Sequence, residues 1–165
     1  MEEFHEKIIN KQELKFYKIV EKEGIAPKII EVIKLKFSDK KYLLKTLKYP
    51  YTLREYCELL STDYTTEETN LILRPYYQQV NNIIDQLHNM GILHGDFHSD
   101  NIVVNPDDNT VKIIDFGRTR FIKDIDLSEF GGIVDFMNVH HKNPIRTIDQ
   151  LLNLEKRMYR VSLHI

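Results

Sequence analysis

The chain contains little cysteine, glycine and proline, and each scarcity excludes a class of protein. The single cysteine, Cys57, cannot form an internal disulfide, so we expect a reducing, cytoplasmic compartment. Six glycines and five prolines in 165 residues are too few for a fibrous or low-complexity chain. No apolar run is long enough to cross a membrane, and the charged segment MEEFHEKIIN has no secretory core. We therefore expect no membrane partner.

Arginine is absent from residues 1–48, which hold twelve lysines against eight acidic residues, whereas residues 49–165 hold eleven basic and seventeen acidic residues. The lysines are spread among acidic residues, as on a solvated surface, so we expect no nucleic-acid partner. A chain of 165 residues that is 42% apolar and 29% charged can bury one core. We expect a single domain over 1–165, with a boundary between two lobes near residue 48.

The N-terminal third predicts one helix and two strands. Apolar residues at three- and four-residue spacings predict a helix over 10–22, ended by Gly24. The segments KIIEVIKLKF and KYLLKTL flank Ser38-Asp39 and predict two antiparallel strands joined by a tight turn. A short helix, TLREYCELL, is expected after Pro50.

The pattern of the remaining residues predicts two longer helices, one before and one after a β-hairpin. The apolar face of RPYYQQVNNIIDQLHNMG predicts a helix with Pro75 in its first turn and Gly91 just past its end. The runs IVV and VKII flank the turn-forming NPDDNT and predict a hairpin over 102–114. We also expect a break in regular structure at Gly131-Gly132 and a final helix over 145–161.

The segment HGDFHSDN, residues 94–101, concentrates polar side chains and raises the question of a metal site. His94 and His98 are four residues apart, as two ligands on one helical face would be. Gly91 and Gly95 make a continuous helix doubtful here, and no HExxH or CxxC spacing is nearby. We do not expect a zinc site.

A longer pattern is more specific. His94, Asp96 and Asn101 follow H-x-D-x-x-x-x-N, and the predicted hairpin then leads to Asp115-Phe116-Gly117. With this spacing the chain resembles the catalytic core of the protein-kinase-like superfamily, most strongly over 76–117. The resemblance implies an α+β, protein-kinase-like fold with a reduced N-lobe over about 1–48 and a short, mostly helical C-lobe over about 49–165.

The resemblance also implies roles for individual residues in ATP- and Mg²⁺-dependent phosphoryl transfer. Asp96 would orient or accept the proton of the substrate hydroxyl, and Asn101 and Asp115 would bind Mg²⁺ and, through it, the nucleotide phosphates. His94 would brace the loop. The backbone at Thr46, Leu47 and Lys48 would meet the adenine ring.

Upstream, QELKFYKIVEKEGIAPKIIEVI is similar to the C-helix and fourth strand of a kinase, with Glu13 in place of the glutamate that pairs with the phosphate-binding lysine. Only ten residues precede this helix, where kinases carry a glycine-rich loop and a lysine-bearing third strand, and no G-x-G-x-x-G is present. Lys7 or Lys11 could replace the lysine only by an unusual route. We therefore expect Glu13 to lack an evident partner and ATP affinity to be weak.

Three functions remain open. The first is an atypical Ser/Thr protein kinase that acts on a protein substrate, similar to the minimal kinases of large DNA viruses. The second is a pseudokinase that docks a protein partner. The third is a small-molecule phosphotransferase, because HGDFHxxN also resembles aminoglycoside and choline phosphotransferases, with His98 where Ser/Thr kinases carry lysine. Gly95 replaces the arginine of kinases regulated through a phosphorylated activation loop, so we expect no such regulation. The oligomeric state stays open.

Overall fold

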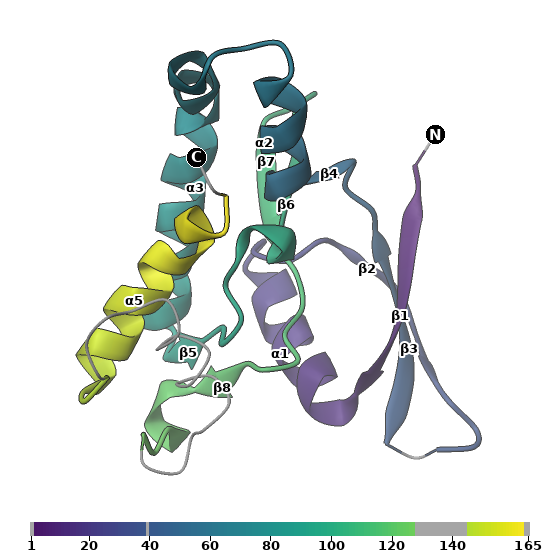
Figure 1. The fold of residues 1–165 in the computed structure, drawn as a ribbon. Coiled ribbons are helices and arrows are strands. Elements are labelled where there is room, and N and C mark those ends of the chain that lie inside the picture. Colours follow the sequence, from purple (N-terminus) through teal and green to yellow (C-terminus); the bar gives the residue numbers. More distant parts are fainter. Residues whose placement is uncertain (1, 39, 128–144, 164–165) are drawn as a thin grey trace.

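The computed structural model describes residues 2–38, 40–127 and 145–163. Its N-terminal part is a three-stranded antiparallel sheet in the order β1-β3-β2, formed by β1 (Phe4–Asn10), β2 (Ile29–Lys34) and β3 (Lys41–Leu47) (Figure 1). The two strands predicted around Ser38-Asp39 are confirmed as β2 and β3. Strand β1 was not predicted, and it pairs with β3 from Phe4 opposite Leu47 to Asn10 opposite Lys41.

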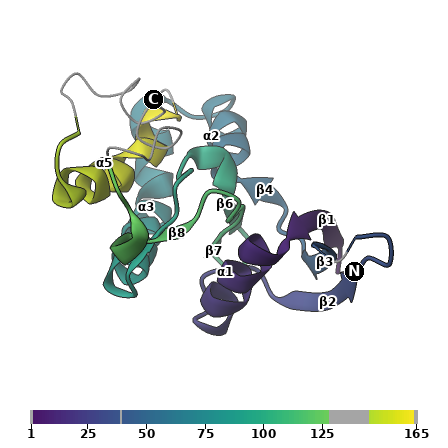
Figure 2. The same ribbon diagram turned by 90° about the horizontal axis from the view of Figure 1, so that it is seen from below.

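Helix α1 (Lys11–Lys22) follows β1 without a linker. Asn10 ends the strand and also caps the helix, because its side-chain oxygen accepts the N–H of Glu13 at 2.8 Å. Gly24 ends the segment at φ +72°, in the left-handed region that favours glycine. The helix predicted over 10–22 is thereby confirmed. It lies on the face of the sheet turned toward the other helices (Figures 1 and 2).

The remaining described helices are α2 (Leu53–Ser61), α3 (Thr66–Asn89) and α5 (Ile148–Val161). Each begins with a capping box, in which a threonine and a Glu or Gln three residues later satisfy backbone N–H groups reciprocally. Helix α2 and the C-terminal helix confirm the predictions, the latter starting at Ile148 instead of residue 145. The predicted break at Gly131-Gly132 lies outside the described residues.

Helix α3 begins earlier than predicted. Pro75 is not in its first turn, because the Thr65–Glu68 capping box starts the helix nine residues before the proline. Proline deprives the carbonyl of Leu71 of its helical partner, but Leu71 and Pro75 lie on the exposed face, where water can bind that carbonyl. The end of the helix was predicted correctly, since Gly91 follows the C-cap residue Met90 with φ +76°.

Short strands place the loops of the site. The predicted hairpin is confirmed as β6 (Ile102–Asn105) and β7 (Thr110–Ile113), and β4 (Tyr51–Thr52) extends it to a three-stranded sheet. Strand β5 (Ile92–Leu93) pairs with β8 (Arg120–Phe121), so the segments before and after the hairpin lie side by side. The 3₁₀ turn η1 (Ser99–Asn101) ends the HGDFHSDN segment, and a second one, η2 (Ile122–Asp124), follows β8.

One hydrophobic core joins the two parts of the molecule. It extends from α1 and β3 through α2 and α3 to the hairpin, and it contains the buried rings of Phe97 and Phe116, which both pack against His94. A smaller cluster connects α5 to Leu93 in β5. The architecture is therefore the expected α+β, kinase-like one with a reduced sheet. Among the described helices, none is long and apolar enough to cross a membrane.

Candidate active site

The loop between β5 and η1 carries Asp96 and is held by His94. His94 is fully buried, with Nε2 2.9 Å from the carbonyl oxygen of Ile114 and Nδ1 accepting the N–H of Asp96 at 3.2 Å. Because Nδ1 accepts, Nε2 carries the proton and donates it. The ring also packs edge-on against Phe116, with 5.2 Å between centroids. The expectation that His94 braces the loop is confirmed.

Glu155 of α5 holds the same loop from the opposite side. Its carboxylate is fully buried and accepts the backbone N–H groups of His94 at 3.1 Å and Gly95 at 2.8 Å. It also lies 2.9 Å from Nε2 of His88 in α3. A buried charge is tolerated only when it is paired and hydrogen-bonded, and here the backbone of this loop supplies two of the donors. Sequence reasoning missed this residue.

Asp96, His98 and Asn101 form a hydrogen-bonded group. The amide nitrogen of Asn101 donates to the backbone carbonyl of Asp96 at 2.8 Å and to its Oδ2 at 3.3 Å. Nδ1 of His98 accepts the N–H of Asp100, so the proton is on Nε2, which lies 3.4 Å from Oδ1 of Asp96. The three side chains therefore orient one another.

The two titratable members of this group shift each other's pKa. Burial alone would raise the pKa of Asp96, but the hydrogen bond from His98 and the electrostatic influence of His98, His94 and Arg118 lower it below its ordinary value. The hydrogen bond with Asp96 raises the pKa of His98 despite partial burial. Asp96 is accordingly a carboxylate at neutral pH.

Asp115 follows β7 and adopts a conformation that is uncommon for a residue other than glycine. Its φ is +63°, in the left-handed region, where a residue with a side chain pays about 1–2 kcal/mol. Its Oδ1 accepts the N–H of Gly117 at 3.3 Å. Strain of this kind is concentrated at functional sites, where the surrounding structure holds it.

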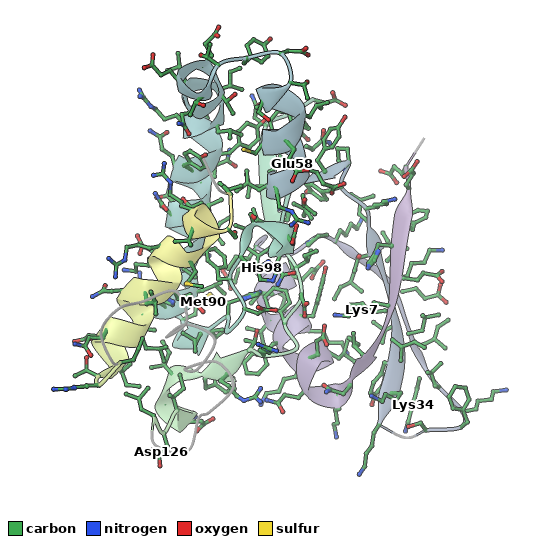
Figure 3. The ribbon with its side chains drawn as sticks, viewed as in Figure 1. Lys7, Lys34, Glu58, Met90, His98 and Asp126 are labelled. Carbon is green, nitrogen blue, oxygen red and sulfur yellow. The ribbon has the colours of Figure 1, made fainter. Side chains whose placement is uncertain are left out.

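Lys7 is the partner that Glu13 was expected to lack. Its Nζ lies 3.0 Å from Oε2 of Glu13 and 3.4 Å from Oδ1 of Asp115, and Figure 3 shows it on the side of the sheet that faces His98. Glu13 is 8% exposed. Burial alone would lower the pKa of Lys7, but the hydrogen bond to Glu13 and the negative charges of both carboxylates raise it.

The expectation that Glu13 lacks an evident partner is therefore wrong. It assumed that a lysine-bearing strand needs room well before the helix. In this chain the strand turns directly into α1 at Asn10, so Lys7 and Glu13 meet although only six positions separate them.

Two adjoining cavities lie between the N-terminal sheet and the hairpin with its flanking residues Asn101 and Asp115. The first, of about 380 Å³, is lined by the charged group Lys7, Glu13 and Asp115 together with Asn101. The second, of about 280 Å³, is lined by Val103 and by the end of β3 with the residues after it. Both cavities are bordered by His5, Thr46 and Ile114. They form one cleft, with the charged group at one end and the segment that follows β3 at the other.

The predicted base-binding residues border the second cavity. Thr46 is buried, and Leu47 and Lys48 line the second cavity. The N–H of Leu47 donates to the carbonyl of Lys28 at 2.9 Å, and the N–H of Lys48 donates to the carbonyl of Glu3 at 2.9 Å. The structure thus brings Thr46, Leu47, Lys48, Asn101 and Asp115 to one cleft, with Asp96 hydrogen-bonded at its edge.

A family model described as "Protein kinase domain" matches residues 2–138, which include every residue of this cleft. The chain belongs to the protein kinase domain family. The match begins at the strand that carries Lys7, so the kinase domain includes the segment in which sequence reasoning saw no element.

Two curated mouse (Mus musculus) proteins are similar to part of this kinase domain. Sperm motility kinase 1 is 33% identical over 88 residues, which cover 49% of this chain and 17% of that protein. The sperm motility kinase Tcr mutant form is 35% identical over 82 residues, covering 46% and 16%. The aligned regions thus span about a sixth of the length of these relatives.

Among solved structures, the kinase PK-1 of the Cydia pomonella granulovirus superposes with a TM-score of 0.55 over 72% of this chain and 43% of that one, at 15% identity. This likeness concerns the fold alone, and it agrees with the predicted similarity to small viral kinases.

Proposed function

We propose that this kinase domain transfers the γ-phosphate of ATP to a serine or threonine hydroxyl of a protein, with Mg²⁺ as the metal cofactor. The observation that carries the proposal is the double contact of Lys7, whose ammonium joins Glu13 of α1 to Asp115 on the cleft that also contains Asn101. A cation held between two carboxylates at a cavity is well suited to bind phosphate oxygens.

In this proposal Lys7 binds the phosphates and Glu13 positions it. The raised pKa keeps the ammonium charged at neutral pH. Glu13 is nearly buried on a helix whose N-cap is Asn10, so its carboxylate is fixed by the first turn of α1. The lysine is 41% exposed and its stem can turn toward a ligand without leaving Glu13.

Asn101 and Asp115 fit a magnesium ion by the chemistry of their donors. Mg²⁺ takes oxygen ligands, few of them from the protein and the rest from phosphates and water. The amide nitrogen of Asn101 is engaged by Asp96, so its carbonyl oxygen is the atom that can coordinate, and Asp115 adds a carboxylate. When bound, the ion would neutralise charge on the phosphates.

Asp96 is the proposed acceptor for the hydroxyl proton. Its side chain is 19% exposed, so a substrate can reach it, and its lowered pKa keeps it ionised. Asn101 and His98 fix the orientation of the carboxylate from two sides. Positioning of the hydroxyl is most of what phosphoryl transfer requires of this residue.

The test is transfer of radiolabelled phosphate from Mg-[γ-³²P]ATP to a mixture of casein and histones by the purified chain. We expect transfer that Asp96→Asn lowers by about 10²–10⁴-fold and that Asp107→Asn, a matched change in the exposed turn after β6, leaves intact. Transfer that survives Asp96→Asn would contradict the assignment.

Two results would favour the other functions. The absence of a G-x-G-x-x-G segment from the 165 residues supports a protein-docking pseudokinase, which would show neither transfer nor a Mg-ATP-dependent thermal shift. His98 next to Asp96 supports a small-molecule phosphotransferase. That enzyme would consume ATP with alcohol-bearing metabolites and leave the proteins unlabelled.

A further inference from the structure

The carboxylates around the candidate site already have cationic or proton-donating partners. The pairs in the described part of the chain are Asp96 with His98 at 3.4 Å, Asp100 with Arg54 at 2.8 Å, and Asp115 with Lys7 at 3.4 Å. Arg54 comes from helix α2 and binds Asp100, the one of these carboxylates that the proposed function does not use. A basic substrate residue that approaches this loop would therefore compete with Arg54 for Asp100.

Arg118 lies beside the same loop without a counter-charge in the described part of the chain. It is exposed, and its side chain has no ion pair or hydrogen bond with the residues that the structure describes. Its neighbour Thr119 is buried, and the Thr119 hydroxyl donates to the carbonyl oxygen of His94 at 2.8 Å. This bond holds the Arg118 backbone next to the loop, and Arg118 acts electrostatically on Asp96. A substrate whose hydroxyl reaches Asp96 therefore passes an arginine that can accept an anion.

Two lysines continue the positive charge along this surface. Nζ of Lys15 in α1 lies 4.9 Å from the centre of the Phe121 ring, and Nζ of Lys123 in η2 lies 5.5 Å from it. Phe121 follows Arg118 by three positions, which is about 10 Å along an extended chain. Residues 118–124 hold three basic residues and one acidic residue, whereas the whole chain has a net charge of −2. Arg118, Lys15 and Lys123 together form a basic patch.

The patch suits carboxylates better than nucleic acid. Within the described residues, none of its three cations has a carboxylate at ion-pair distance, and each carries several N–H donors that an anion can accept. Its aromatic ring, Phe121, packs against Phe16 with 4.8 Å between centroids and is also engaged by both lysines. The ring is therefore not available to stack on a base, as a site for single-stranded nucleic acid would require.

We propose that the basic patch binds acidic side chains that flank the phosphorylated hydroxyl of the protein substrate. The inference rests on the proposed function, since it names the substrate class of the same site. One exposed ion pair changes affinity by about two- to fivefold, so three pairs together should give about tenfold or more. Complementary charge also speeds association, and salt weakens both effects because it screens the charges.

The test is binding of three fluorescein-labelled peptides to the full chain, measured by fluorescence anisotropy. Each peptide has a central serine, flanked on both sides by Glu, by Gln or by Lys. We expect the Glu peptide to bind about tenfold more tightly than the Gln peptide and the Lys peptide to bind most weakly. About 0.5 M NaCl should remove most of this difference. A Gln or Lys peptide that binds as tightly as the Glu peptide would overturn the inference.

A competitor and a transfer assay separate the remaining possibilities. A single-stranded oligonucleotide that displaces the Glu peptide more effectively than unlabelled Glu peptide would show a nucleic-acid surface and overturn the inference. Transfer from Mg-ATP that is as fast to the Lys peptide as to the Glu peptide would overturn the inference and leave the proposed function standing. Salt-sensitive binding of the Glu peptide without transfer to any protein or peptide would contradict the proposed function and leave the docking of acidic peptides in place.

Charge reversal at one residue checks where the peptide binds. Arg118→Glu should weaken the Glu peptide by about fivefold or more and strengthen the Lys peptide, because the sign of the interaction changes. Lys15→Gln should weaken the Glu peptide by about two- to fivefold and leave the Gln peptide unchanged. The matched control is Lys45→Gln, because Lys45 in β3 also lies over a phenylalanine, 4.7 Å from the centre of the Phe4 ring. Equal effects of Lys15→Gln and Lys45→Gln, or loss of both charged peptides in Arg118→Glu, would overturn the inference.

Discussion

Replacing Glu155 should separate the loop that carries Asp96 from helix α5, which holds it. The fully buried carboxylate accepts two backbone N–H groups of the loop, from His94 and Gly95, and lies 2.9 Å from Nε2 of His88. Glu155→Ala leaves these donors without an acceptor in a buried space. Glu155→Gln keeps one acceptor oxygen but turns an NH₂ group toward a donor.

The expected cost follows from these partners. Each buried donor left without an acceptor costs about 1–3 kcal/mol, and breaking a buried charged network costs about 3–5 kcal/mol. We expect Glu155→Ala to lower the free energy of unfolding by about 4 kcal/mol and Glu155→Gln by about 2 kcal/mol. For a chain of this length 1 kcal/mol corresponds to about 2–4 °C in Tm, so the alanine variant should melt about 12 °C lower.

The measurement is urea unfolding together with thermal melting, with Lys156→Met as the matched control. Lys156 is the next residue in α5 and makes an exposed ion pair with Asp85 at 3.0 Å, whose loss should cost less than about 1 kcal/mol. If Glu155→Ala costs no more than Lys156→Met, then the carboxylate does not hold the loop, and the argument from burial is wrong.

Three other changes test the site. Lys7→Met should lower kcat/KM for phosphotransfer by about 10²-fold or more because it removes the phosphate-binding cation. Lys7→Arg keeps the positive charge and should retain part of the activity. Equal losses in the two variants would show that charge is not the cause. Asp115→Gly and Asp115→Ala both remove the carboxylate, but only glycine relieves the strain of a φ of +63°. In urea unfolding the glycine variant should therefore be more stable than the alanine variant by about 1 kcal/mol. Equal stability of the two variants would argue against stored strain. His98→Gln should lower Tm by about 2 °C at pH 5.5 and less at pH 8.5. The pKa of His98 is raised in the folded state, so its stabilisation is complete below the unfolded pKa of about 6.5 and is lost as pH rises through the folded value; a larger effect at pH 8.5 would reverse the sign and refute the assignment.

Local patterns predicted much of the fold. The apolar spacing of α1, the turn residues of the hairpin and the glycine after α3 each depend on neighbours in the chain, so their positions could be read without knowledge of the rest. Asp96, Asn101 and Asp115 could be predicted as candidate site residues for the same reason, because a loop and one short hairpin join them. The start of α3 was misjudged because the capping box at Thr65 lies outside the segment with the clearest periodicity.

The partners of these residues come from elsewhere and were not visible. Glu155 lies 60 positions beyond Gly95, and nothing local distinguishes it from an exposed helical glutamate until α5 packs beneath the loop. Lys7 was considered and set aside, because its strand is defined by pairing with β3 more than thirty residues later. Hydrogen bonds across a sheet do not depend on sequence separation, and composition alone does not reveal them.

The sequence by itself determined the chemistry available to this protein: two carboxylates and an amide at a spacing that suits phosphoryl transfer, on helices and strands set by local periodicity. The tertiary structure decided which charges neutralise one another and which backbone donors are engaged. It placed Lys7 between Glu13 and Asp115 and buried Glu155 beneath the loop. It also paired the N–H of Lys48 with the carbonyl of Glu3 in a hydrogen bond. The physical reason is that pairing of charges and hydrogen bonds depends on distance in space, which only the folded chain defines.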